Sequence, residues 1–152
     1  MADRCQGINL TEERVQFNVV RQAPSSYRVE NGQILKHMTV ILDICDIDGS
    51  DTPKVQALLN DVTHVVSPPG TTSGDIEVTE GTPTEEDQVR EMKFEIEEEV
   101  INIYETKDHL ILVASPVQKI FLTNKVDGEN NPMLRCLARV ALNTIPKPTR
   151  VQ

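Results

Sequence analysis

The sequence contains few aromatic residues: three Phe, two Tyr and no Trp among 152 residues. Proteins that bind single-stranded nucleic acid stack bases on aromatic side chains in a basic groove. The formal net charge of −9 also repels phosphate backbones and anionic membrane surfaces. We therefore expect no nucleic-acid partner and no membrane partner, and a core built from Val, Ile and Leu.

The sequence also lacks long apolar runs and paired cysteines. No stretch approaches the roughly 18 apolar residues of a membrane-spanning helix. The first residues, 1–7, have neither the basic start nor the apolar stretch of a signal peptide. Cys5, Cys45 and Cys136 are odd in number and widely spaced, which argues against a disulfide framework. These absences predict a cytoplasmic protein.

Glycine is scarce as well, with seven residues, and no glycine-rich phosphate-binding loop is present. The closest stretch, 70–74, leads into an acidic segment, so we expect no nucleotide or other cofactor. No G-x-S-x-G motif occurs, and His37, His64 and His109 lack the spacing of a zinc site. The sequence therefore favours a non-enzymatic protein, with a hydrolase built from dispersed residues as the weaker alternative.

The densest polar cluster surrounds Gly49. Asp46, Asp48 and Asp51 could supply hard oxygen ligands to a divalent cation, and they are the weak metal candidates of this chain. The EF-hand pattern requires an acid or amide at the position that Ile44 occupies. A solvated hairpin loop explains the same residues without a metal.

Two further clusters have ordinary structural explanations. Cys136 follows Arg135, whose charge could activate a thiol, but neighbours on a strand point to opposite faces. Packing as a small hydrophobe therefore explains Cys136 better. Glu95, Glu97 and Glu99 share one face of a predicted strand, where charge protects an exposed edge.

A weak duplication spans much of the chain. Four residues recur 77 positions later: Phe17, Tyr27, Ile34 and Leu35 as Phe94, Tyr104, Ile111 and Leu112. Five more recur 79 positions later: Asp48, Gly49, Pro53, Leu58 and Pro69 as Asp127, Gly128, Pro132, Leu137 and Pro148. A unit of about 55 residues buries only roughly 60% of its unfolded surface, so the two copies are expected to share one core.

The duplication and the composition divide the chain into four segments. Residues 1–14 form a polar leader, and residues 15–69 form the first β repeat. Residues 70–93 carry seven acidic and two basic residues, which predicts an acidic flexible linker. Residues 94–152 form the second β repeat.

Alternating apolar residues predict a mostly β protein, in which two similar antiparallel repeats pack as a pseudo-twofold barrel or sandwich. The Asp-Gly pairs at 48–49 and 127–128 predict hairpin turns. The residues after each proline fit a strand or an amphipathic helix. An α+β fold with helices at 53–66 and 132–145 is therefore the alternative.

Three functional hypotheses follow from these patterns. The leading one is a non-enzymatic structural or protein-interaction module with an acidic surface, which binds a protein partner or associates with itself. The second is a small-ligand or metal-binding protein with its site between the repeats, because pockets form at such interfaces. The third is the hydrolase.

Overall fold

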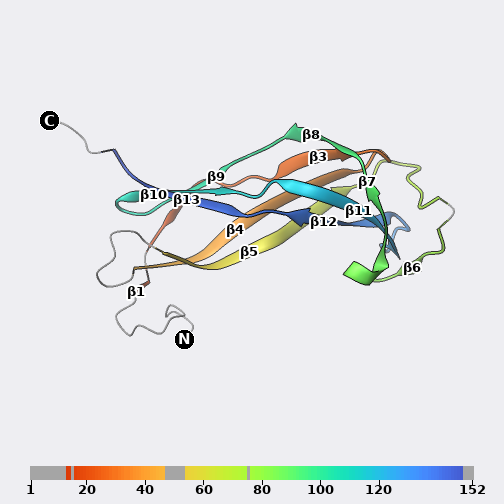
Figure 1. Cartoon of the computed structure of the whole chain (residues 1–152), viewed down its shortest axis with the longest axis horizontal. Helices are drawn as coiled ribbons and strands as arrows, with labels where there is room; N and C mark the ends of the chain where they lie inside the picture. The colour runs from red at the N-terminus through yellow and green to blue at the C-terminus, as the bar shows by residue number, and fades with distance from the viewer. Residues whose placement is uncertain (1–12, 15, 47–53, 75, 149–152) are drawn as a thin grey trace.

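The computed structural model describes residues 13–14, 16–46, 54–74 and 76–148; of Glu13, Arg14, Cys45, Asp46 and residues 54–62 it describes the backbone alone. The described residues form thirteen strands and one short 3₁₀ turn (Figure 1). In order these are β1 (Glu13–Arg14), β2 (Asn18–Arg21), β3 (Ser25–Val29), β4 (Ile34–Asp46), β5 (Lys54–Val66), β6 (Thr79–Glu80), η1 (Glu85–Asp87), β7 (Gln88–Met92), β8 (Phe94–Glu98), β9 (Asn102–Glu105), β10 (His109–Ala114), β11 (Val117–Val126), β12 (Pro132–Ala138) and β13 (Ala141–Pro146).

The mostly β prediction is confirmed, and the α+β alternative is wrong for the described residues. The segment 53–66 contains β5, and the segment 132–145 contains β12 and most of β13. In β12 the burial of alternating apolar side chains outweighed the helix propensity of the segment, so a strand forms. Leu134 and Cys136 pair with Leu122 and Ile120 of β11 and share their buried face.

The strands form three sheets. Sheet A has the order β1-β4-β3-β8, with β5 on the other side of β4. Sheet B has the order β13-β10-β9-β2, and sheet C has the order β12-β11-β6 with β7 also paired to β11. The pairs are antiparallel except β6 with β11. The sheets do not close into a barrel, so that part of the prediction is wrong.

Sheet A forms one layer, and sheets B and C form the other. At one end Tyr27, Val29 and Leu35 of sheet A pack against Ile120, Leu122 and Leu134 of sheet C. At the other end Ile41 and Ile44 of sheet A pack against Tyr104, Ile111 and Val113 of sheet B. The aliphatic core with two tyrosines agrees with the composition.

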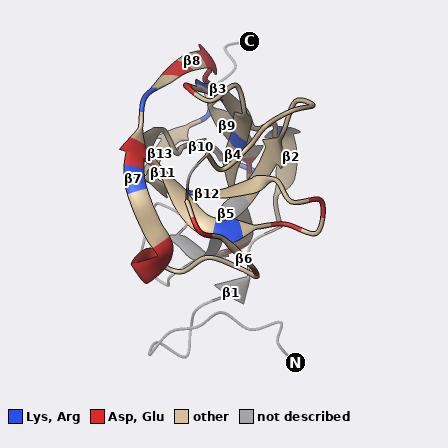
Figure 2. Cartoon of the chain, turned by 90° about the vertical axis from the view of Figure 1, so that its right-hand side faces the viewer, with Lys and Arg blue, Asp and Glu red and all other residues tan. Residues whose placement is uncertain are grey.

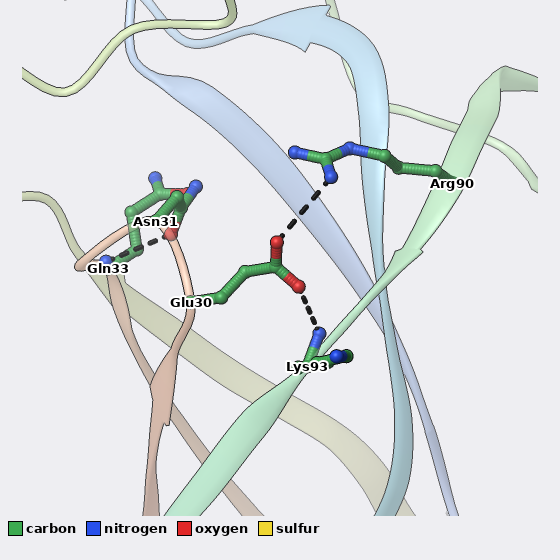
Figure 3. Close-up of polar contacts among 5 residues, drawn as sticks. All are labelled: Glu30, Asn31, Gln33, Arg90 and Lys93. Carbon is green, nitrogen blue, oxygen red and sulfur yellow. Dashed lines mark hydrogen bonds and ion pairs between the residues drawn. The ribbon is translucent and has the colours of Figure 1, made fainter.

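The acidic segment 70–93 contributes β6 and β7 to sheet C and contacts the β3–β4 turn of sheet A. Its last residues form β7, which pairs with β11 and places Met92 in the core at 2% exposure. Glu30 lies in the turn after β3. Its Oε2 accepts a hydrogen bond from the Lys93 backbone N–H, and its Oε1 lies 3.5 Å from Arg90 Nη1 (Figure 3). The part of the predicted linker around β7 is therefore held by β11 and by the β3–β4 turn.

Matched contacts join the first strand of each half to the other half. β2 pairs with β9 and β8 pairs with β3, so each half receives a strand from the other. Phe17 meets Tyr104 edge-on at 5.9 Å, and Phe94 meets Tyr27 edge-on at 5.7 Å. These contacts recur at the offset of 77 that the sequence shows for Phe and Tyr.

Backbone donors next to these strands follow the same offset. The Ala23 N–H donates to Asn102 Oδ1 at 2.8 Å, and the Val100 N–H donates to Ser25 Oγ at 2.8 Å. Neither pair involves identical side chains, so the sequence identities alone did not reveal it. The two halves therefore correspond in their backbone path and in these two hydrogen bonds beside the strands.

Two sequence identities, Ile34 with Ile111 and Leu35 with Leu112, do not coincide with matched positions. Tyr27 pairs with Leu35 across β3 and β4, whereas Tyr104 pairs with Ile111 across β9 and β10. Leu35 and Ile111 are both fully buried, and they lie 76 positions apart. The apparent match of Leu35 with Leu112 is therefore displaced by one residue, because the β3–β4 turn is one residue longer.

No helix in the described part of the chain has the length and apolar character needed to cross a lipid bilayer.

Candidate functional site

The outer face of sheet B carries a cluster of aliphatic side chains. Tyr104, Ile111 and Val113 point into the core, so the alternate residues of the same strands point outward. The outward set pairs across the strands, Leu112 with Ile103 and Leu110 with Ile145. We call these four residues, Ile103, Leu110, Leu112 and Ile145, the aliphatic face.

The aliphatic face is partly exposed to solvent, and both charged residues of sheet B adjoin it, because Arg21 pairs with Ile103 and Glu105 pairs with Leu110. Ile145 is 37% exposed, and Leu110, Leu112 and Ile103 are half-buried. Within the four strands of sheet B, Arg21 and Glu105 are the only acidic or basic residues besides His109. Glu105 Oε2 forms an ion pair with Lys147 Nζ at 3.1 Å beside the face. Contiguous apolar side chains that are partly exposed make this face a candidate interaction surface.

The opposite end of the molecule carries the charge. The 3₁₀ turn η1 consists of three acidic residues, and β8 contains three glutamates. Figure 2 looks at this end and shows acidic residues on β8, on β7 and on the turn before β7. Sheet B, with the aliphatic face, lies toward the end where both termini emerge (Figure 1).

A groove of about 490 Å³ lies between β5 and β12. Among the described strands, β5 pairs only with β4 and β12 only with β11, so the groove runs between two open sheet edges. Thr63, Val65 and Ser67 line one side, and residues 132–136 line the other. Gln33 is fully buried beside it, and its Nε2 donates to Ser67 Oγ and to the Pro132 carbonyl, both at 2.9 Å.

Cys136, which lines this groove, lies beside a buried histidine. Cys136 Sγ is 4.0 Å from His37 Nδ1, and the same nitrogen lies 3.1 Å from Thr63 Oγ1. His37 is 1% exposed, on the inner face of β4 directly opposite Ser25 and Thr63. His37 and the fully buried Thr39 separate the two halves of the apolar core.

Burial also changes the acidity of the two core tyrosines. Desolvation raises the pKa of Tyr27, although its hydroxyl accepts a hydrogen bond from the Val117 N–H at 3.1 Å. Desolvation likewise raises the pKa of Tyr104, whose hydroxyl accepts from the Ile41 N–H at 3.3 Å and donates to Gln22 Oε1 at 2.6 Å. Both phenols therefore stay neutral and serve as hydrogen-bonding groups within the core.

The described residues include too little of the candidate metal ligands to define a site. Asp48 and Asp51 lie outside the described residues, and of Asp46 the backbone alone is described, paired with Glu13. In the matching loop, Asp127 Oδ1 accepts hydrogen bonds from the Glu129 and Asn131 N–H groups, which hold its pKa below the usual range. Among the described residues no group of three acidic, histidine or cysteine side chains could hold a metal ion.

The three histidines do not come together in one site. His37 is buried, His64 is exposed at the groove, and His109 begins β10 in sheet B. The contact of His37 with Cys136 joins residues 99 positions apart, and no spacing rule reveals such a pair. The sequence does contain a signal for the aliphatic face. Residues 110–114 are all apolar, whereas a strand with one solvent-exposed face alternates apolar and polar residues.

Comparisons of this chain with protein-family models, with curated proteins and with solved structures find no match.

Proposed function

We propose that this protein is a non-enzymatic interaction module that docks through the aliphatic face, and that its partner on this face is a second copy of the chain. The observation that supports the proposal is the unpaired outer face of sheet B, where Ile103, Leu110, Leu112 and Ile145 lie together at the surface. Burying such side chains contributes about 25 cal/mol per Å² of apolar surface removed from water.

The distribution of charge supports a second copy as the partner. A chain with a net charge of −9 repels its own copies wherever acidic surfaces meet. The acidic residues of η1 and β8 lie at the end opposite sheet B, and Arg21 and Glu105 balance one another within sheet B. Two copies meeting through this face in a twofold arrangement bring apolar surfaces together and keep the acidic ends apart.

Sedimentation velocity over a range of protein concentrations tests this proposal. We expect the wild-type protein to associate into a dimer, and we expect Leu112→Glu and Ile145→Glu to weaken the dimer by tenfold or more, which is about 1.4 kcal/mol. Leu137→Glu is the matched control, because Leu137 is 50% exposed on sheet C, away from the face. A wild-type protein that stays monomeric at high micromolar concentration would refute the proposal, as would equal effects of all three variants.

The groove between β5 and β12 supports a second candidate function, the binding of a small ligand. Its volume of about 490 Å³ falls within the roughly 300–1,000 Å³ of small-molecule pockets. It lies between a strand of residues 15–69 and a strand of residues 94–152, where a site between the repeats is expected. A thermal-shift screen of common metabolites tests it: at 100 times the dissociation constant, a ligand stabilises by about 2.7 kcal/mol. Thr63→Trp, which fills the groove, should remove the shift.

We also propose that the two halves are related by a pseudo-twofold axis and arose as two copies of one unit. The exchanged strands, the Phe–Tyr contacts and the hydrogen bonds to Ser25 and Asn102 all support this relation. Two fragments, 1–75 and 76–152, offer the test. Expressed separately and then mixed, they should reconstitute one folded complex, whereas a fragment that folds alone as a monomer would contradict the shared core.

A further inference from the structure

We propose that Cys136 is a reactive thiol and that the groove between β5 and β12 admits a small-molecule disulfide with which Cys136 exchanges. The proposal deepens the second candidate function, because it rests on the same groove and assigns a chemistry to it. It concerns a stoichiometric modification of the protein and requires no resident ligand.

The position of Cys136 combines access with a nearby base. Cys136 is half-buried, lines the groove, and occupies the inward face of β12 with Leu134 and Ala138. The thiolate is the nucleophile in disulfide exchange, so a thiol needs a partner that accepts its proton. His37 Nδ1, at 4.0 Å from Sγ, is that partner.

The surrounding strands hold the His37 ring in place. His37 lies between Ser25 on β3 and Thr63 on β5 in the register of sheet A, and Thr63 Oγ1 lies 3.1 Å from Nδ1. At 1% exposure the ring is shielded from competing water. A histidine fixed beside a sulfur is the arrangement that activates nucleophilic cysteines.

Several charged and titratable groups of the described residues lie near the thiol. Tyr27 approaches Cys136 from within the core, and its raised pKa keeps it neutral below alkaline pH. His64, Asp127 and Arg135 line the groove toward solvent. Arg135 donates from Nη1 to Gln88 Oε1 at 2.6 Å, which directs its guanidinium toward β7.

The exchange balances without any further reactant. The Cys136 proton passes to His37 Nδ1, and the thiolate attacks one sulfur of a disulfide R–S–S–R. A Cys136–S–S–R bond forms as the original S–S bond breaks, and the leaving R–S⁻ takes the proton from His37. The small-molecule disulfide is the oxidant, and one equivalent of it is reduced to the thiol R–SH. The groove volume of about 490 Å³ accommodates an R group of tripeptide size.

Oxidised glutathione and the native protein provide the first test. The modification of each cysteine is followed by peptide mass spectrometry, with Cys5 and Cys45 as comparators in the same chain. We expect Cys136 to react at least about tenfold faster than either comparator at pH 7, where an ordinary thiol is only a few per cent ionised. In denaturant the three rates should become similar. A native Cys136 that reacts more slowly than both comparators would show a packed hydrophobe and refute the proposal.

The role of His37 is tested by His37→Gln against the matched control His64→Gln, since His64 lines the same groove but is exposed. We expect His37→Gln to slow Cys136 about tenfold at pH 7 and by less than about threefold near pH 9.5, where the thiol ionises unaided. His64→Gln should change neither rate. A loss that is equal at both pH values would indicate a structural role for His37 and contradict the assignment.

Thr63→Val provides a second variant if His37→Gln fails to fold. It removes the hydroxyl that lies 3.1 Å from His37 Nδ1 and competes with the thiol for that nitrogen's lone pair, so it should speed Cys136 at pH 7 and change the rate little near pH 9.5. The exchange experiments and the metabolite screen test separate claims. A flat metabolite screen together with fast exchange at Cys136 leaves the thiol chemistry standing, whereas a metabolite hit with a slow Cys136 leaves only the binding site.

Discussion

The hairpin of β3 and β4 and the hairpin of β9 and β10 have similar inner faces and different outer faces. On the inner face Tyr27 pairs with Leu35, and Tyr104 pairs with Ile111. On the outer face of the first hairpin Ser26 pairs with Lys36. At the matching place in the second hairpin, Ile103 pairs with Leu112, and both belong to the aliphatic face.

This difference separates the requirements of folding from those of binding. Packing constrains the inner positions, because a buried side chain must fill the space between the layers. The outer positions carry no such constraint, so an aliphatic pair there indicates a use for the surface itself. This difference is the basis of the docking role proposed for β9 and β10.

The largest effects are expected at the inner positions. Leu35→Ala and Ile111→Ala each remove a fully buried aliphatic side chain, so each should lower the free energy of unfolding by about 2–5 kcal/mol. Chemical denaturation followed by circular dichroism measures both. If the two halves share one core, each variant unfolds in a single transition. A biphasic transition in either variant would mean that the two hairpins belong to independent units.

The tyrosine hydroxyls should show a smaller effect and a difference between the hairpins. Tyr27→Phe and Tyr104→Phe leave the N–H groups of Val117 and Ile41 without their acceptors, which costs about 1–3 kcal/mol each. We expect the greater loss at Tyr104, because its hydroxyl also donates to Gln22 at 2.6 Å. Urea unfolding of the two variants decides the order, and a larger loss at Tyr27 would contradict it.

Alkaline pH should weaken the fold through the same two residues. Burial raises the pKa of Tyr27 and of Tyr104 above the ordinary tyrosine value of 10.0, so the unfolded chain releases these protons first. Their contribution to stability is complete below that value and is lost as the pH rises through the folded pKa. Urea unfolding of the wild type at increasing pH should show the decline. The Tyr27→Phe, Tyr104→Phe double variant should lose less stability over the same range, and an equal decline would assign it to other groups.

The smallest effects are expected from the ion pairs beside the two hairpins. Arg28 Nη2 lies 2.6 Å from Glu97 Oε2 near β3, and Lys147 Nζ lies 3.1 Å from Glu105 Oε2 near β9. Both pairs are partly exposed, so Arg28→Ala and Lys147→Ala should each cost no more than about 1 kcal/mol. The loss should shrink further in high salt. A cost that persists in high salt would show that the side-chain stems, rather than the charges, contribute the stability.

The strands were predictable because their cause is local. Met38 to Ile44 alternate, and the Asp127–Gly128 pair begins the turn between β11 and β12. The helix alternative for 132–145 failed because tertiary packing on β11 outweighed the helix propensity of Leu, Ala and Arg. Local patterns thus identified the elements, and their pairing in the wider fold decided the ambiguous one.

The features that sequence patterns missed depend on distant partners. β7 lies within a strongly acidic segment, and only its pairing with β11 and the burial of Met92 make it a strand of the fold. The contact between His37 and Cys136 exists because β4 and β12 belong to opposite layers. No single-sequence rule connects such positions, because the register of each strand with its neighbour must be known first.

The exchange of first strands has a consequence for synthesis on the ribosome. β2 emerges early, but its partner β9 follows some 84 residues later (Asn18 to Asn102), and β3 likewise waits for β8. At about 5–20 residues per second, this delay lasts roughly 4–17 s. During that time β4 already has β1, β3 and β5 as partners, but the edge of β3 that pairs with β8 stays open. We therefore expect the nascent N-terminal half to be prone to aggregation through this open strand edge until the second half is translated.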